Sequence, residues 1–463
     1  MALFNKKDKN GLNIIIVGCG KVGSTLIDQL TKEGHDISII DNNSAKIQEL
    51  TNLYDVMGVV GNGASFTVQK EAGVDDADLL IAVTGSDELN MLCCTVAKRV
   101  GNCAAIARVR TPDYSQEIGY LREKLGLAMI INPEQEAATE AARILGMPFA
   151  IEVDSFAHGQ AELVKFKVPE DNKLDGKALF NLDKNQSESV LICGVERNGE
   201  VFIPSGNFVI QAGDLVSVLG TRKSIRKFMG YIGIQTHSVR NSMIIGGGKA
   251  AYYLANELIH MGIAVKIIER DRNRCEELST LLPKAIIING DGSEEELLKE
   301  EGIEGIESFI PLTGIDEENI MLTLHAKQVS QAKIITKINR INFSNVINSL
   351  DLGSVIYPKY ITSEAIIAYV RAKRNSLGSS NIETLYHIFN QQAEAIEFKV
   401  TDAEKIIDIP LMDLSLKKNL LVSCITRGGK VIIPRGQDCI KKGDSVVVIT
   451  TNTGFKDITD ILK

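Results

Sequence analysis

Two glycine-rich segments of the sequence have the spacing of a dinucleotide-binding loop. The first, GCGKVG at 18–23, follows the apolar run NIIIV and opens an amphipathic segment, so it joins a predicted strand to a predicted helix. In such a loop the first glycine allows a tight turn, the second lets the backbone approach a pyrophosphate, and the third lets the helix pack closely on the sheet. Free N–H groups at the start of the helix bind the phosphates. The segment therefore predicts a nucleotide site.

Further groups of this predicted site follow at the ends of later strands. Asp41 closes the second predicted strand, about 20 residues after Gly18, where a carboxylate accepts hydrogen bonds from ribose hydroxyls. Its negative charge disfavours the 2′-phosphate of NADP. Open parallel sheets bind ligands at the carboxyl ends of their strands. The candidates at these ends are Asn62, Gly63, Thr84, Gly85 and Arg108.

Some of these assignments have a competing structural explanation. Arg108 can neutralise a phosphate or lie along an adenine ring, but it can also pair with a surface carboxylate. Asn62 and Gly63 can also form nothing more than a turn. The glycine loop and Asp41 carry the prediction, because a strand, the loop and a helix surround them in the order that the fingerprint requires.

The chain repeats this arrangement about 230 residues later. The glycine loop recurs as GGGKAA at 246–251. LLIAVTGSDELNML at 79–92 is answered by SFIPLTGIDEENIM at 308–321, which shares Thr, Gly, Asp, Glu and Asn in one loop and helix start. ICGVERNGEVFIP at 192–204 matches VSCITRGGKVIIP at 422–434. A repeat of this length is a pair of domains rather than a solenoid unit.

The second copy offers an equivalent set of site residues. They are Gly246, Gly247, Gly248, Lys249, Ala250, Glu269, Asp291, Thr313, Gly314 and Lys337. Ala251 takes the third glycine position, and Glu269 is one methylene longer than Asp41. Lys337 is a point charge that lacks the planar fork of arginine. We therefore expect the second site to bind more weakly or to bind a different ligand, unless this copy has become purely structural.

The elements that must position these groups are visible in the patterning of each copy. The first ~140 residues alternate short β-branched runs with amphipathic segments, which indicates βαβ units around a buried parallel sheet. The following ~80 residues contain short strand-like runs, joined by Gly and Asn turns, and one short helix. The predicted fold class is α/β, with two tandem units, each a Rossmann-like doubly wound parallel-sheet domain followed by a small β-rich α+β domain.

Amphipathic helices are predicted to link the two parts of each unit. The predicted parts are a first Rossmann-like part at 12–132, a linker helix at 133–149, a first C-terminal part at 150–231, a second Rossmann-like part at 240–357, a linker helix at 358–380 and a second C-terminal part at 381–463. The linker helices are long enough to pack domains or protomers together.

Composition excludes several classes of protein. The chain has 463 residues and a formal net charge of -8, so it offers no broad basic surface for a nucleic-acid backbone. No apolar run reaches the ~18 to 20 residues that cross a bilayer, and the N-terminal sequence lacks the apolar core of a signal peptide. Eight cysteines without CxxC or Cys/His spacing predict reduced thiols rather than a metal site. We expect a cytoplasmic protein that binds no nucleic acid.

The sequence lacks the groups of a hydride-transfer enzyme. Such an enzyme adds a positioned His, Lys or Tyr beside its cofactor, but the six histidines do not recur between the copies in any shared motif. No Gly-x-Ser-x-Gly elbow, His-Glu-x-x-His or Walker A sequence is present. The sequence predicts a non-enzymatic nucleotide sensor without catalytic residues. The alternatives are an NAD-dependent oxidoreductase and a purely structural ring scaffold.

The motifs resemble those of a known family. In the first copy they occur in the order GCGKVG, IIDNN, GNGAS, EAGVDDADLLIAVTGSDELNM and IARVRTPDY, followed by NGEVFIP and AGD, and the second copy then repeats this order. The order resembles that of TrkA, the family of peripheral nucleotide-binding subunits of bacterial Trk potassium uptake systems. The resemblance covers residues 12–463. It implies two tandem regulator-of-conductance-of-potassium (RCK) units, each with a Rossmann-like part and a small C-terminal part.

The resemblance also implies a function. In this family the units assemble into a homo-oligomeric ring on the cytoplasmic face of the membrane, and ligand-induced rearrangement of the ring gates a membrane potassium-translocating subunit of the TrkH type. The implied regulatory ligands are NAD(H), ATP and ADP, which share an adenosine ribose and a phosphate chain. Asn62 stands where many related domains carry an acidic residue. The resemblance also implies which residues form the two sites. The first would use Gly18, Cys19, Gly20, Lys21, Val22, Asp41, Thr84, Gly85 and Arg108, and the second would use Gly246–Ala250, Glu269, Thr313, Gly314 and Lys337.

Overall fold

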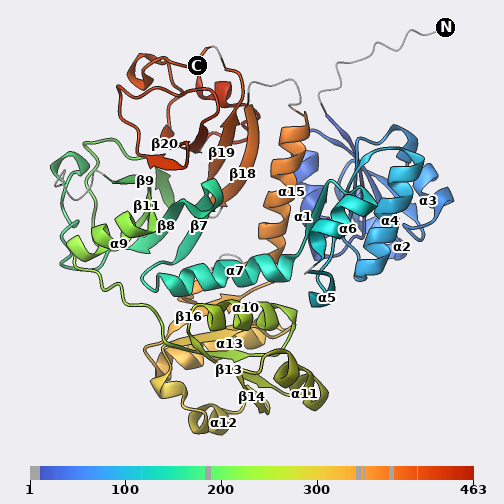
Figure 1. Ribbon diagram of the computed structural model, residues 1–463, viewed down its shortest axis with the longest axis horizontal. Helices are drawn as coiled ribbons and strands as arrows, with labels where there is room; N and C mark the ends of the chain where they lie inside the picture. Colours follow the sequence, from blue (N-terminus) through green and yellow to red (C-terminus); the bar gives the residue numbers. More distant parts are fainter. Residues whose placement is uncertain are drawn as a thin grey trace.

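Each repeat of the sequence folds as a parallel sheet followed by an antiparallel sheet. The computed structural model describes residues 11–463 apart from 116, 183–188, 340–346, 348–349, 375–379, 390 and 404. The two parallel sheets have six strands each, in the orders β3-β2-β1-β4-β5-β6 and β14-β13-β12-β15-β16-β17, and the two antiparallel sheets have five strands each. The predicted fold class is confirmed (Figure 1).

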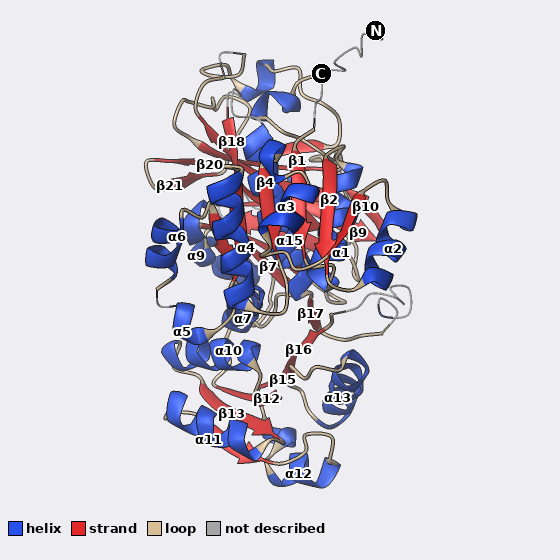
Figure 2. Cartoon of the chain, turned by 90° about the vertical axis from the view of Figure 1, so that its right-hand side faces the viewer, coloured by secondary structure: helices blue, strands red, loops and turns tan. Residues whose placement is uncertain are grey.

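The first parallel sheet carries the first predicted site at its carboxyl edge. Its strands are β1 (Asn13–Val17), β2 (Asp36–Asp41), β3 (Met57–Val60), β4 (Leu79–Ala82), β5 (Ala104–Arg108) and β6 (Met129–Ile131). Its helices are α1 (Lys21–Lys32), α2 (Ser44–Leu53), α3 (Phe66–Glu71), α4 (Asp87–Val100), α5 (Pro112–Ser115) and α6 (Ile118–Leu125). All four residues of β4 are buried, because helices cover both faces of the sheet (Figure 2). The strand order reverses between β1 and β4, which is where such sheets bind ligands.

The second parallel sheet has the same plan. Its strands are β12 (Asn241–Ile245), β13 (Ala264–Glu269), β14 (Ile286–Asn289), β15 (Ser308–Pro311), β16 (Lys333–Lys337) and β17 (Ser354–Ile356). Its helices include α10 (Lys249–His260), α11 (Arg272–Leu281), α12 (Glu295–Glu300) and α13 (Asp316–Val329). The strands β6 and β17 are not predicted from the sequence, because a three-residue strand is too short to show a periodic pattern.

The antiparallel sheets form the small C-terminal parts. The first contains β7 (Glu152–Phe156), β8 (Ala161–Lys167), β9 (Val190–Arg197), β10 (Glu200–Phe202) and β11 (Leu215–Gly220), followed by α9 (Arg222–Tyr231). The second contains β18 (Ser380–Ile388), β19 (Ala393–Val400), β20 (Leu420–Arg427), β21 (Lys430–Ile432) and β22 (Ser445–Thr450). The repeated Arg and Gly-Asp residues form equivalent ion pairs, Arg197 with Asp214 and Arg427 with Asp444, each at 2.7 Å.

The two units pack crosswise. The linker helix α7 (Pro133–Gly146) of the first unit packs against α10 of the second, and the linker helix α15 (Pro358–Arg374) of the second packs against α1 of the first. Figure 1 shows α7 lying above α10 and α15 standing beside α1. Four alanines on the buried face of α7 let α10 approach closely. Each linker helix therefore shares a core with the Rossmann-like domain of the opposite unit.

A buried ion-pair triad fixes one of these crossed contacts. Arg371 on α15 is 3% exposed. It binds Glu33 at the end of α1 at 2.6 Å and Glu394 on β19 at 3.0 Å. The two antiparallel sheets also share a core, in which Phe156 and Phe389 are buried. No helix in the described part of the chain has the length and apolar character needed to span a bilayer.

Candidate nucleotide sites

The backbone of the first glycine loop requires glycine at two of its three fingerprint positions. Gly18 has a φ of +101°, its N–H donates to the Ile40 carbonyl at 2.9 Å, and a Cβ there would lie 2.9 Å from the Thr84 nitrogen. A Cβ on Gly23 would lie 1.9 Å from the Gly18 carbonyl oxygen. The space around Gly20 is open: apart from its chain neighbours, no atom of the described residues lies within 4 Å of a Cβ built there. The loop therefore closes tightly on the sheet and leaves its outer side accessible.

The helix that follows the first loop has no side-chain cap. Gly20 is the N-cap residue of α1, whose first residues are Lys21 and Val22. By contrast, α2 and α11 are capped by their own side chains, Asn43 and Asp271. Uncapped N–H groups at a helix start are the groups to which phosphates bind. The geometry at α1 therefore fits an anionic ligand.

Asp41 stands beside the loop and is held by backbone groups. Its Oδ2 accepts a hydrogen bond from the Cys19 N–H at 2.7 Å, and its Oδ1 accepts one from the Asn43 N–H at 2.8 Å. Each carboxylate oxygen has a second lone pair that a ribose hydroxyl can use. Burial and the neighbouring Asp41 charge raise the pKa of the Cys19 thiol to about 12. Cys19 therefore contributes its N–H to this site, with its thiol neutral.

Asn62 and Gly63 have structural contacts that need no ligand. The Asn62 Oδ1 accepts a hydrogen bond from the Ala64 N–H at 3.0 Å, which makes a local turn. A Cβ on Gly63 would lie 2.2 Å from Val17 Cγ1. The buried Gln69 amide donates to the Gly63 carbonyl at 2.7 Å. These contacts favour the turn explanation of both residues.

A buried asparagine organises the loop after β4. The Asn90 Oδ1 accepts hydrogen bonds from the Thr84 N–H at 2.8 Å and from its Oγ1 at 2.7 Å, and the Asn90 Nδ2 donates to the Arg108 carbonyl at 2.9 Å. Asn90 is fully buried. The Arg108 Nη2 in turn donates to the Thr84 carbonyl at 2.7 Å, while its buried Nε has no hydrogen-bond partner among the residues that the structure describes. Arg108 thus lies across the loop rather than paired with a surface carboxylate.

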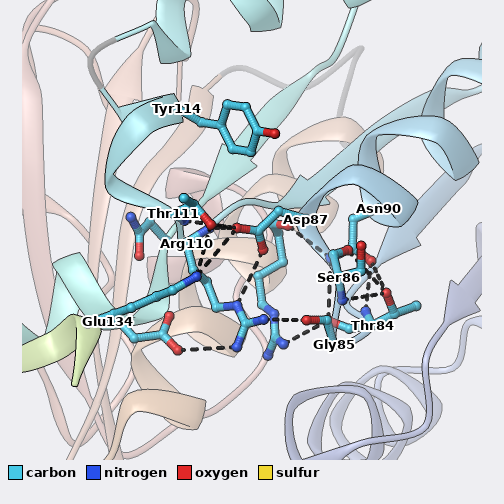
Figure 3. A network of polar contacts seen from close by, with 12 residues as sticks. Thr84, Gly85, Ser86, Asp87, Asn90, Arg110, Thr111, Tyr114 and Glu134 are labelled. Carbon is cyan, nitrogen blue, oxygen red and sulfur yellow. Dashed lines mark hydrogen bonds and ion pairs between the residues drawn. The ribbon is translucent and has the colours of Figure 1, made fainter. Parts of the chain in front are cut away.

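Asp87 holds the next part of this loop in place (Figure 3). Its carboxylate accepts hydrogen bonds from the Arg110 N–H at 2.9 Å, from the Thr111 N–H at 2.8 Å and from the Thr111 Oγ1 at 2.7 Å. Burial raises the pKa of Asp87, but the hydrogen bonds from Thr111 and Arg110 outweigh it and hold the pKa below its usual value. The loop therefore carries a fixed negative charge at neutral pH.

The second site surrounds a cavity of ≈ 360 Å³. Eight of the predicted residues line it: Gly246, Gly247, Gly248, Glu269, Asp291, Thr313, Gly314 and Lys337. Other lining residues, which the sequence did not single out, include Arg270 and Glu318. Lys249 and Ala250 open α10 next to the cavity but do not line it. The Lys249 side chain instead donates to Thr111 of the first unit at 2.9 Å.

The second site repeats the bonds of the first with different residues. The Glu269 Oε2 accepts a hydrogen bond from the Gly247 N–H at 2.6 Å, and its Oε1 accepts one from the Asp271 N–H at 2.7 Å. Burial lowers the pKa of Lys337, whose Nζ donates to the Leu312 carbonyl at 2.9 Å. Despite its extra methylene, Glu269 therefore accepts the same pair of backbone hydrogen bonds as Asp41.

Two pairs of equivalent residues in the first turns of α4 and α13, Asn90 with Asn319 and Asp87 with Asp316, organise the sites and were not assigned a role from the sequence. The Asn319 side chain accepts a hydrogen bond from the Thr313 N–H and donates one to the Lys337 carbonyl. Asn90 makes the same two bonds with Thr84 and Arg108. Asp316 accepts from the Asn339 N–H at 2.9 Å as Asp87 accepts from Arg110. The repeat could have pointed to these residues, because Asp and Asn are among the identities that segments 79–92 and 308–321 share.

Comparisons with known proteins agree with the repeat. The TrkA-N domain family matches residues 14–133 and 242–358, and the TrkA-C domain family matches 163–233 and 395–463. The chain is 32% identical over 456 residues to the Trk system potassium uptake protein TrkA of Haemophilus influenzae, covering 98% of each chain.

Solved structures show the same fold at lower sequence identity. The GsuK RCK domain has a TM-score of 0.63 at 18% identity, covering 96% of this chain and 94% of that one. The GsuK channel bound to NAD has a TM-score of 0.62 at 18% identity, covering 96% of this chain and 78% of that one. With both domain families matched in tandem and a relative of this identity matched along nearly its whole length, the chain belongs to the TrkA family of Trk system potassium uptake proteins.

Proposed function

We propose that this protein is the nucleotide-sensing regulatory subunit of a potassium uptake system. One observation carries the proposal: two glycine-loop sites of matching hydrogen-bond pattern lie in domains that pack on the linker helix of the opposite unit. A ligand shifts such an arrangement when it binds one conformation more tightly than another. The crossed linker helices would transmit this difference to a membrane potassium-translocating partner.

The ligands are proposed to be NAD(H) and ATP or ADP. Support comes from the uncapped start of α1 for phosphates, from Asp41 and Glu269 for ribose hydroxyls, and from the GsuK channel, whose solved structure contains NAD. These nucleotides share the ribose and phosphate groups that the two sites are proposed to bind. The protein is proposed to bind them without turnover.

Calorimetric titration with NADH, NAD, ATP and ADP tests this function. We expect binding without cofactor turnover, and loss of binding at the first site in Asp41→Ala, because ribose loses its acceptor and the Cys19 N–H loses its partner. Asp55→Ala, which removes an exposed carboxylate from the same domain, is the matched control and should bind as the wild type. Turnover of a cofactor with a substrate would favour the oxidoreductase alternative, and no binding at millimolar nucleotide would refute the sensor.

Gating is tested by growth at low potassium. A strain without this protein, and without a second uptake system, should take up potassium poorly. The wild-type gene should restore uptake and Asp41→Ala should not. Normal uptake in the deletion strain would refute the proposed role, and full restoration by Asp41→Ala would favour a purely structural scaffold.

Assembly of several copies into a ring is also proposed. Both Rossmann-like domains expose large apolar side chains at equivalent positions: Leu53, Met57 and Leu92 in the first, and Leu281, Ile286 and Met321 in the second. Met57 and Ile286 begin β3 and β14, which are edge strands of their sheets. Exposed apolar edges of this kind mark protein interfaces. Joining the two patches head to tail between copies would close a ring.

Light scattering on Met57→Glu and Ile286→Glu tests the assembly. Each variant should reduce the oligomer to smaller species, because a charge at the edge would be buried in the contact. Tyr120→Glu, which alters an exposed apolar position on α6, is the control. With its net charge of -8, the protein would reach the cytoplasmic face of the membrane through its partner rather than by attraction to anionic lipid.

A further inference from the structure

A two-residue segment, Arg110 and Thr111, joins the first nucleotide site to the second unit. On one side it faces the loop after β4. The Asp87 carboxylate accepts hydrogen bonds from both backbone N–H groups of the segment, and the Arg110 Nη2 donates to the Gly85 carbonyl. Figure 3 shows these contacts converging between Thr111, Asp87 and Gly85. The position of the segment therefore sets the position of a loop that borders the first site.

On its other side the segment is held by α10 of the second unit. The Lys249 Nζ donates to the Thr111 Oγ1 at 2.9 Å and lies 4.0 Å from the Asp87 carboxylate. One turn further along, the Tyr253 hydroxyl donates to the Arg110 carbonyl at 2.9 Å and accepts from the Asn132 Nδ2 at 3.1 Å. Tyr253 is 6% exposed, so these bonds are shielded from water and correspondingly strong.

The helix α10 begins in the second nucleotide site. Gly246, Gly247 and Gly248 line the cavity of that site, and Gly248 is the N-cap residue of α10. Lys249 is the first residue of the helix, and Tyr253 follows within one turn. A ligand that fixes this glycine loop therefore also fixes the two side chains that hold the segment of the first unit.

In the part of the chain that the structure describes, the equivalent residues of the first unit make no such contact. Lys21 corresponds to Lys249, and its exposed ammonium has no hydrogen bond or ion pair with any residue that the structure describes. Thr25 takes the place of Tyr253 and donates back to the Lys21 carbonyl of its own helix at 2.9 Å. Among the described residues, the contacts of Lys249 and Tyr253 therefore have no counterpart at Lys21 and Thr25.

We propose that Lys249 and Tyr253 couple the two nucleotide sites of one chain, so that a nucleotide at the second site raises the affinity of the first. This inference rests on the proposed function, since both sites must bind nucleotide. A ligand on the second glycine loop fixes the start of α10, α10 fixes Arg110 and Thr111, and these hold the 84–87 loop in its ordered position. By linkage, a nucleotide at the first site raises the affinity of the second by the same factor.

Calorimetric titration with ADP, repeated with NAD, measures this coupling. The affinity of the first site is compared between the wild type and Glu269→Ala, in which the second site is disabled. It should fall about fivefold or more in Glu269→Ala, the lower end of typical coupling factors. The background Thr111→Val/Tyr253→Phe removes both hydrogen bonds between α10 and the segment, leaves only the 4.0 Å approach of Lys249 to the Asp87 carboxylate, and keeps every predicted nucleotide-binding residue. In that background Glu269→Ala should change the first-site affinity by less than about twofold, as expected for independent sites.

The neighbouring tyrosine of α10 supplies a matched control. The hydroxyl of Tyr252 forms no hydrogen bond with any part of the chain that the structure describes, and its ring lies 5.3 Å from that of Tyr253. Tyr252→Phe should therefore keep the coupling factor of the wild type. A loss of coupling in this variant equal to that in the double variant would contradict the assignment to Tyr253.

Hydrogen exchange gives a second readout. In Asp41→Ala, whose first site is disabled, ADP or NAD should slow exchange at the amides of Arg110 and Thr111, and Thr111→Val/Tyr253→Phe should abolish this protection. Coupling that persists in the double variant overturns the inference, as do equal first-site affinities in the wild type and Glu269→Ala. Either result leaves the proposed function intact, whereas a wild type that binds no nucleotide overturns both.

Discussion

The two glycine loops reach one hydrogen-bond pattern by different means. In the first, Asp41 accepts from the Cys19 N–H, and in the second the longer Glu269 accepts from the Gly247 N–H. The longer acid leaves little room for a side chain on the loop. A Cβ on Gly247 would lie 3.1 Å from the Glu269 Oε2 and 2.6 Å from Leu278 Cδ1. The two loops therefore differ in two matched residues. The first combines Asp41 with Cys19, and the second combines the longer Glu269 with Gly247, so that the same hydrogen bond forms in both.

The third glycine position gives the largest expected difference between the two units. A Cβ on Gly23 would lie 1.9 Å from the Gly18 carbonyl oxygen, whereas the second unit carries the fully buried Ala251 there. Gly23→Ala should lower the free energy of unfolding by about 1–3 kcal/mol, as overpacking does, and abolish nucleotide binding at the first site. Ala251→Gly should cost only about 0.5–1 kcal/mol through helix propensity. Thermal unfolding and calorimetry measure both, and an unchanged first-site affinity in Gly23→Ala would contradict the clash.

The residue between the first two glycines, Cys19 or Gly247, gives the next largest effect. We expect exchanging it to weaken nucleotide binding in the second unit but not in the first. Gly247→Cys places a side chain against Glu269 and Leu278, and should weaken nucleotide binding at the second site by tenfold or more, which corresponds to about 1.4 kcal/mol. Cys19→Gly removes a buried thiol but keeps the N–H that Asp41 needs. It should leave first-site affinity within about twofold and cost about 1 kcal/mol of stability. Equal losses of affinity in the two variants would show that the acid and the loop residue are not matched.

Much of the fold follows from local patterns in the sequence. The strands β1, β2, β4 and β5 are short, mainly apolar runs, and the glycine loop between β1 and α1 has a fixed spacing. Both signals lie within a few residues of chain, so the sequence alone predicts the parallel sheets and the residues at their carboxyl edge. Because the chain is a repeat, each motif occurs twice, and the second occurrence supports the prediction made from the first.

The crossed packing could not be predicted in this way. Lys249 belongs to the second glycine loop by sequence, yet its ammonium donates to Thr111 of the first unit. The direction of that side chain depends on how two distant domains meet, which no local spacing encodes. Asn90 is an intermediate case, since the repeat preserves it but only the structure shows that it joins Thr84 to the Arg108 carbonyl.

The two linker helices also differ in how they place acids around the cavity of ≈ 370 Å³ between them. From α15, Glu364 accepts a hydrogen bond from the His387 N–H at 3.0 Å and lies 3.3 Å from the His387 ring. From α7, Glu136 projects a buried Oε2 that has no hydrogen-bond partner in the described part of the chain. Burial raises the pKa of both carboxyls, that of Glu136 to about 8, while His387 opposes the rise at Glu364. Burial also raises the pKa of Glu140 on α7 and of Asp154, which line the same cavity, so α7 contributes more of the pH-sensitive carboxyls than α15.

This difference predicts a pH dependence of stability that originates in α7. The folded-state pKa of Glu136, about 8, exceeds its ordinary value of 4.5, so the folded protein holds this proton over a range in which the unfolded chain has lost it. The free energy of unfolding should therefore fall as pH rises through that range, by up to about 1.4 kcal/mol per pH unit from this group. Glu136→Gln should reduce the slope, leaving the part that Glu140 and Asp154 contribute, and should be more stable than the wild type at the alkaline end, because a neutral amide needs no proton. Glu123→Gln, at an exposed position of α6, should keep the wild-type slope. Urea unfolding across the range measures all three proteins, and parallel slopes for the wild type and Glu136→Gln would place the titrating group elsewhere.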